Sequence, residues 1–168
     1  LDGLTVMVNP ENDWLTELTV DQLAALFGVS STIKQWSDLD PSYPAEDILF
    51  FIPDPDSGTR DFMTEVVAKV KEGEEDLRTD EQTTFSSDDN VLLNGITNEK
   101  NALGFFGYAY YVHNTSKVKA VPIVNSDGTA SGGTCPLCPA FTAELKAKII
   151  ALLDKGHPSI VFIEDDYT

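Results

Sequence analysis

The segment DILFFI, residues 47–52, places the strongest constraint on what this 168-residue chain can fold into. Apolar residues follow one another without alternation, which is typical of a β-strand in a sheet that is covered on both faces. Such a sheet needs helices on either side, because an uncovered apolar face would lie in water. We therefore predict an α/β fold with a central mixed sheet flanked by helices.

Predicted strands and helices alternate along the chain, as this architecture requires. The predicted strands are residues 4–8, 47–52, 103–106 and 118–123, and the first predicted helices are residues 19–27 and 59–71. Thr19 and Gln22 have the spacing of a capping box, and Gly28 follows the first helix at the position of a C-cap. Trp36 and Leu39 are expected to fill the core beneath a surface loop.

Residues 72–84 are acidic and lack periodicity, which predicts a loop. A further helix should begin after Ser86 or Ser87, either of which can serve as its N-cap. A turn or helix is expected from Gly107 onward.

The last quarter of the chain differs in character. Residues 124–141 form a predicted loop that contains CPLC, and residues 142–168 a predicted helix and tail. A local disulfide between Cys135 and Cys138 fits an exported protein, and two free thiols are the alternative. A structural zinc needs about four ligands, and His113 and His157 do not have finger spacing, so no metal site is predicted.

The net charge of -17 limits the partners that the chain can have. Nucleic acid and anionic lipid carry the same sign of charge and are not expected as partners. No segment approaches the ~18 consecutive apolar residues that a membrane helix needs.

The loop DPDSGTRDF, residues 54–62, is nevertheless suited to hold an anion. The first turn of a helix leaves N–H groups without acceptors and carries a partial positive charge. Ser57 and Thr59 can add hydroxyl donors, Gly58 lets an oxyanion approach the backbone, and Arg60 can add a bidentate fork. The alternative is structural: Ser57 or Asp56 is an ordinary N-cap with no ligand.

Several spaced motifs resemble one family. TVDQLAALFG, IKQWSDLDP, DSGTRDFMTE and SSDDNVLLNGITNEKNALGFFGYAYY occur in the order found in phosphate-binding proteins of PstS-type ABC importers, particularly the SphX-like branch. The resemblance covers residues 1–123. It implies a two-lobed, type II periplasmic-binding-protein fold, of which residues 1–168 would be a single lobe that supplies half of a phosphate site.

The resemblance also implies site residues. Ser57, Gly58 and Thr59 match the ligand-binding loop of the family, with Asp56 beside them. Better-known members have an arginine where this chain has Pro53. Arg78 matches an arginine of the SphX-like branch and is the expected clamp, with Arg60 as the second choice.

The function implied is non-catalytic binding of inorganic phosphate, without a cofactor, in the periplasm or outside the cell. An ABC permease would receive the ligand through the full-length protein. Three alternatives stay open: another oxyanion such as sulfate or molybdate, a scaffold module without ligand, and a hydrolase in which His113 or His157 activates Ser57.

Two other groups of residues have both a structural and a functional interpretation. The aromatic residues Phe105, Phe106, Tyr108, Tyr110 and Tyr111 are expected to pack in the core, and a stacking platform for bases or sugars is the alternative. Asp88, Asp89 and Asn90 are expected to complement a helix N-terminus, and calcium ligation is the alternative.

Overall fold

The computed structural model describes residues 3–71, 76–124 and 162–163, and its main sheet there has six strands in the order β4-β3-β5-β1-β6, with β8 beside β1. These strands are β1 Gly3–Val8, β3 Leu49–Pro53, β4 Thr83–Ser86, β5 Ala102–Gly107, β6 Lys119–Ala120 and β8 Phe162–Ile163. β3 runs parallel to β4 and β5, whereas β1 runs antiparallel to β5. The sheet is therefore mixed, as predicted.

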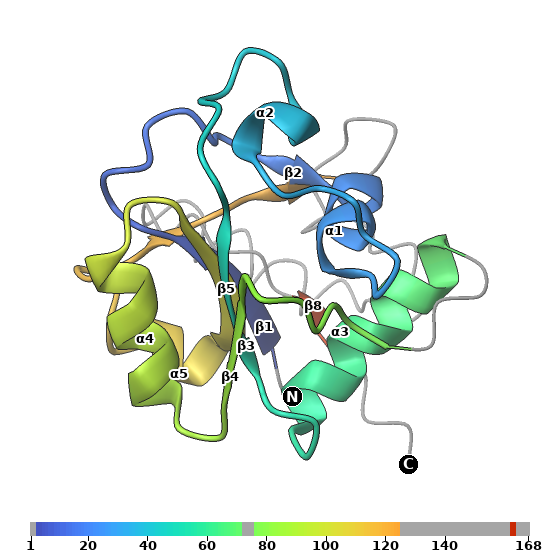
Figure 1. Cartoon of the computed structure of the whole chain (residues 1–168). Helices are drawn as coiled ribbons and strands as arrows, with labels where there is room; N and C mark the ends of the chain where they lie inside the picture. The colour runs from blue at the N-terminus through green and yellow to red at the C-terminus, as the bar shows by residue number, and fades with distance from the viewer. Residues whose placement is uncertain (1–2, 72–75, 125–161, 164–168) are drawn as a thin grey trace.

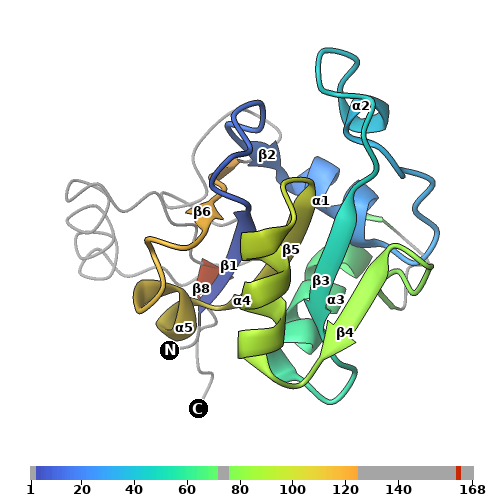
Figure 2. The same ribbon diagram turned by 60° about the vertical axis from the view of Figure 1, so that its left-hand side comes forward.

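Helices cover both faces of this sheet (Figures 1 and 2). α1 (Val20–Phe27) and α3 (Gly58–Val70) lie on one face, and α4 (Asp89–Asn98) and α5 (Tyr108–Val112) lie on the other. In β3, Phe50 and Ile52 belong to the core on the α1 side, while Phe51 packs against the core on the α4 side. This two-sided burial explains the continuous apolar run in β3.

Smaller elements lie beyond one end of the sheet. α2 (Trp36–Leu39) is a single turn, and β2 (Leu18–Thr19) pairs in parallel with β7 (Ile123–Val124). Trp36 is fully buried, as predicted, and Leu39 packs partly buried against the same core. The Thr19 capping box is confirmed: the hydroxyl accepts from the backbone N–H of Gln22 at 3.0 Å, and the Gln22 side chain accepts from the Thr19 N–H.

Three boundaries in the sequence prediction are wrong. The strand expected at residues 118–123 is two strands, because Pro122 between them has no N–H to donate. β4 begins inside the predicted loop of residues 72–84. The N-cap of α4 is Asp88 and neither serine, because Ser86 is still paired with Pro53 in the sheet.

Two glycines allow α4 and β5 to approach β3 closely. A Cβ on Gly95 would overlap the ring of Phe51, and one on Gly104 would overlap the Phe51 carbonyl oxygen and lie 2.8 Å from Cδ1 of Ile96. Both positions therefore require the absence of a side chain.

Several predictions lie outside the described residues: the helix from residue 142, the CPLC loop with Cys135 and Cys138, and His157. The division of the chain at residues 123 and 141 likewise stays a prediction. Within residues 3–71, 76–124 and 162–163, no helix is long and apolar enough to cross a membrane.

Candidate functional site

The carboxyl ends of the parallel strands β3, β4 and β5 lie at one edge of the sheet. A helix begins just beyond each of them, with Ser57, Asp88 and Gly107 as the N-caps of α3, α4 and α5. The loops that lead into α3 and α4 lie together at the lower end of the sheet in Figure 1. Open α/β sheets bind ligands at this edge.

Backbone hydrogen bonds fix the loop between β3 and α3. Asp54 donates its N–H to the carbonyl of Ser86 at 3.1 Å, which ties the loop to the end of β4. Ser57 donates to the Asp54 carbonyl at 3.1 Å, and Asp56 donates its N–H to Oδ1 of Asp54 at 3.2 Å. Asp56 itself is exposed at the tip of the turn.

Ser57 occupies the N-cap position without capping the helix. Its side chain makes no capping hydrogen bond, whereas Thr19 accepts from Gln22 in α1 and Asp88 accepts from Asn90 in α4. The interpretation of Ser57 as an ordinary capping serine therefore lacks the hydrogen bond that defines it.

The first turn of α3 presents donors at an accessible place. Asp61 donates to the Ser57 carbonyl at 3.0 Å, so the N–H groups of Gly58 and Thr59, which precede it, lack an intrahelical acceptor. Gly58 is exposed, and nothing lies within 4 Å of the position of a Cβ there. Ser57 and Thr59 are half-buried beside it. The structure thus places Ser57, Gly58 and Thr59 together at the start of α3, where the backbone N–H groups are not capped.

Arg60 follows this triad and is buried, with 3% of its surface exposed. Its Nη2 donates to Oδ1 of Asp76 at 2.7 Å, and its Nη1 donates to the Pro53 carbonyl at 3.4 Å. The guanidinium also lies 5.2 Å from the centroid of the Phe85 ring. Arg60 is therefore buried against the end of β3, where it pairs with Asp76.

Arg78 does not join the Ser57 loop. It is 1% exposed, and its guanidinium stacks on Phe50 at 3.7 Å, toward the start of β3, whereas the loop follows the end of that strand. Nη1 donates to the carbonyls of Leu26 at 3.0 Å and Ile33 at 3.1 Å, and Nε and Nη2 both donate to Oδ2 of Asp80. The expected clamp is instead a buried arginine that joins α1 to β3.

The partner of Arg78 gives a pH-dependent contribution to stability. Burial raises the pKa of Asp80, but hydrogen bonds and charge attraction from Arg78, with hydrogen bonds from Thr83 and Gln82, outweigh burial and lower the pKa below its ordinary value of 3.8. A carboxylate with a lowered folded pKa stabilises the protein above its unfolded pKa, and this contribution is lost as the pH falls through the folded value.

We therefore expect the free energy of unfolding to decrease as the pH is lowered below about 4, and to decrease less steeply in the Asp80→Asn variant. Urea unfolding between pH 5 and 3 measures both slopes. Equal slopes for the two proteins would show that ionisation of Asp80 does not contribute to the pH dependence of stability.

The start of α4 contributes polar groups to the same edge. Asp88 caps the helix, and the Tyr110 hydroxyl of α5 donates to Oδ1 of Asn90. Burial, with a smaller contribution from the charge of Asp88, raises the pKa of Asp89. Among the described residues no group of three or more His, Cys, Asp or Glu could hold a metal ion, and capping accounts for Asp88.

The aromatic cluster packs in the core, as predicted. Phe105 is buried in the core on the α1 side, whereas Phe106 and Tyr111 are buried on the α4 side, where Tyr108 and Tyr110 pack partly buried against that core. His113, the proposed base of the hydrolase alternative, is exposed at the C-terminal end of α5. No hydrogen bond joins it to Ser57 in the part of the chain that the structure describes.

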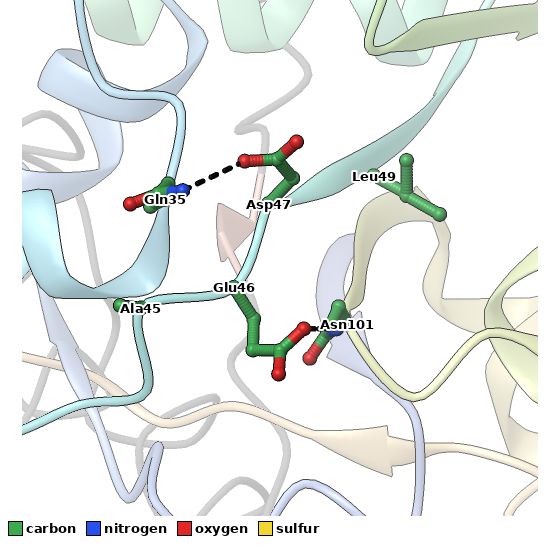
Figure 3. Close-up of a pocket in the computed structure, with 6 residues that line it drawn as sticks. All are labelled: Gln35, Ala45, Glu46, Asp47, Leu49 and Asn101. Carbon is green, nitrogen blue, oxygen red and sulfur yellow. Dashed lines mark hydrogen bonds between the residues drawn. The ribbon is translucent and has the colours of Figure 1, made fainter.

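A pocket of about 380 Å³ lies at the opposite edge of the sheet (Figure 3). Leu49 at the start of β3 lines it, and its carboxylates are paired: Glu46 accepts from Asn101 at 3.4 Å and Asp47 accepts from Gln35 at 3.0 Å. The Ser57 edge also has acidic residues, but it presents the open first-turn amides of α3, so it is the better candidate site for an anion.

Comparisons with known proteins show the family of the chain. The family model described as "PBP superfamily domain" matches residues 1–163. Protein SphX of Synechococcus elongatus is 37% identical over 131 residues, which are 77% of this chain and 37% of that protein. The phosphate-binding protein PstS of Staphylococcus aureus is 36% identical over 134 residues, which are 79% of this chain and 38% of that protein. The chain thus spans under two fifths of the length of these relatives.

Solved structures agree with the fold. A possible phosphate-binding protein from Planctomyces limnophilus superposes with a TM-score of 0.71 at 31% identity, covering 92% of this chain and 60% of that one. A putative phosphate ABC transporter substrate-binding protein with bound phosphate, from Clostridium perfringens, has a TM-score of 0.60 at 20% identity, covering 96% of this chain and 69% of that one. The second match bears on the fold alone.

Proposed function

Since the chain belongs to the PBP superfamily, we propose that it binds inorganic phosphate without catalysis, at the first turn of α3. Ser57 and Thr59 contribute their hydroxyls, and Gly58 and Thr59 contribute backbone N–H groups. The partial positive charge at the start of α3 attracts the anion.

The single observation that carries this proposal is the uncapped state of Ser57. In α1 and α4 the N-cap side chain accepts from one first-turn amide, whereas in α3 the N-cap hydroxyl makes no such bond and lies beside an exposed glycine. A helix end with this arrangement is suited to an external acceptor, because its amides otherwise depend on water. Relatives named as phosphate-binding proteins support phosphate as that acceptor.

The proposal extends to the full-length protein. We propose that it is the solute-binding component of an ABC phosphate importer, that it works in the periplasm or outside the cell, and that a permease takes up its ligand. The names of the relatives support this role. A second lobe would complete the cage, as in the family that the sequence resembles.

Isothermal titration of the full-length protein with phosphate, sulfate and molybdate tests the proposal. We expect phosphate to bind most tightly, and Ser57→Ala combined with Thr59→Ala to weaken it by about 100-fold or more, because each hydroxyl that bonds a charged group contributes about 1.5–3 kcal/mol. Thr115→Ala with Ser116→Ala removes an exposed pair of the same type and should change the affinity less than about twofold.

Each alternative gives a different result. Phosphate binding that survives the double substitution places the site elsewhere, and tighter binding of sulfate or molybdate identifies another oxyanion. No binding of any of the three anions favours the scaffold alternative. Hydrolysis of a simple ester that is lost in Ser57→Ala favours the hydrolase.

A further inference from the structure

The proposed anion site lies in acidic surroundings. Asp54, Asp56 and Asp61 flank Ser57 within the same segment, in a chain whose net charge is -17. From residue 54 to residue 68 the sequence has one basic residue, Arg60. Binding of a dianion here needs a compensating positive charge, because like charges within a few ångströms oppose its entry.

Arg60 carries the one positive charge of this segment, and protein groups hold its guanidinium. Its guanidinium is buried beneath the loop, bonded to the Pro53 carbonyl at the end of β3 and to Asp76 beyond the end of α3. These contacts connect the first turn of α3 to the strand that precedes it. The orientation of the Gly58 and Thr59 amides therefore depends on where Arg60 is held.

The two partners of the Arg60–Asp76 ion pair also differ in solvent exposure. The Arg60 side chain is 4% exposed, whereas that of Asp76 is 56% exposed. Water and salt screen the carboxylate more effectively than the buried guanidinium. A net positive potential beneath the loop follows from this asymmetry.

We propose that Arg60 is a positioning residue that sets the phosphate affinity of the α3 first turn through its buried charge and its bond to the Pro53 carbonyl, whereas the exposed Asp76 contributes to stability and does not set the position of that turn. The inference rests on the proposed function. It assigns opposite effects to the two partners of one ion pair: Arg60 favours anion binding, and Asp76, which carries a negative charge, does not.

Titration of the full-length protein with inorganic phosphate, together with thermal unfolding, tests this inference. Arg60→Gln should weaken phosphate binding about tenfold, and Arg60→Lys, which keeps the charge, should weaken it less. Asp76→Asn should lower the melting temperature but leave the affinity unchanged or up to about threefold tighter. Lys69→Gln, at the far end of α3, is the matched control and should change the affinity less than about twofold.

A purely structural role predicts a different pattern. Arg60→Gln and Asp76→Asn would then weaken phosphate binding together, in step with their loss of thermal stability, and that result would overturn the inference. Unchanged affinity in Arg60→Gln would also overturn it. If Arg60→Gln does not fold, the sign of the Asp76→Asn effect decides. A wild-type protein that binds no phosphate refutes the proposed function itself, and the inference with it.

Discussion

Replacing Arg78 by methionine is expected to lower the free energy of unfolding by about 3 kcal/mol, because the substitution leaves one half of a partly buried ion pair unmatched and two carbonyls without their donor. Asp80 loses its charged partner, and the carbonyls of Leu26 and Ile33 lose their donor. Stacking on Phe50 is lost in part as well. Urea unfolding measures the change.

The control is a second ion pair in the same region. Lys34 and Glu81 are 58% and 81% exposed, so Lys34→Met should cost less than about 1 kcal/mol. The phosphate affinity of folded Arg78→Met should equal that of the wild type, since Arg78 lies away from the Ser57 loop. Strongly weakened phosphate binding with unchanged stability would restore Arg78 as the clamp.

Gly104→Ala is expected to destabilise the protein by about 3 kcal/mol, at the upper end of the cost of overpacking. The new methyl group would overlap the Phe51 carbonyl oxygen, which is fixed in the neighbouring strand and cannot rotate away as a side chain can. The strands β3 and β5 would have to separate at the centre of the sheet. Urea unfolding again gives the measurement.

Gly107→Ala is the matched control for this substitution. It lies at the end of the same strand with nothing within 4 Å of its potential Cβ, and its φ of -60° suits any residue. Its cost should stay below about 1 kcal/mol. Similar losses for the two variants would mean that general loss of glycine, and not overlap with Phe51, determines the effect.

Local signals in the sequence predicted the fold well. The Thr19 capping box acts through residues three positions apart, and the apolar run of β3 reports its own two-sided burial. β4 was missed because it is a four-residue edge strand with polar, exposed positions. The N-cap of α4 could not be chosen among adjacent Ser and Asp residues, because the choice depends on where the pairing of Ser86 with Pro53 ends.

The candidate site was likewise predicted only where its signals are local in the sequence. Ser57, Gly58 and Thr59 are adjacent in the sequence, so their common location at the start of α3 followed from the loop itself. The environment of Arg78 could not be predicted in this way, because two of its acceptors are 45 and 52 residues away along the chain. An arginine in an acidic segment gives no local sign that it is buried.

The uncapped start of α3 also determines how the site should respond to acidity. Backbone amides and hydroxyl groups neither gain nor lose protons across the physiological range, so they offer the same donors at every pH. Discrimination between the protonation states of an anion must then come from the carboxylates around the loop and from the anion itself. A change of phosphate affinity with pH would then report the ionisation of the anion or of acidic groups near it, and not a change in the donors.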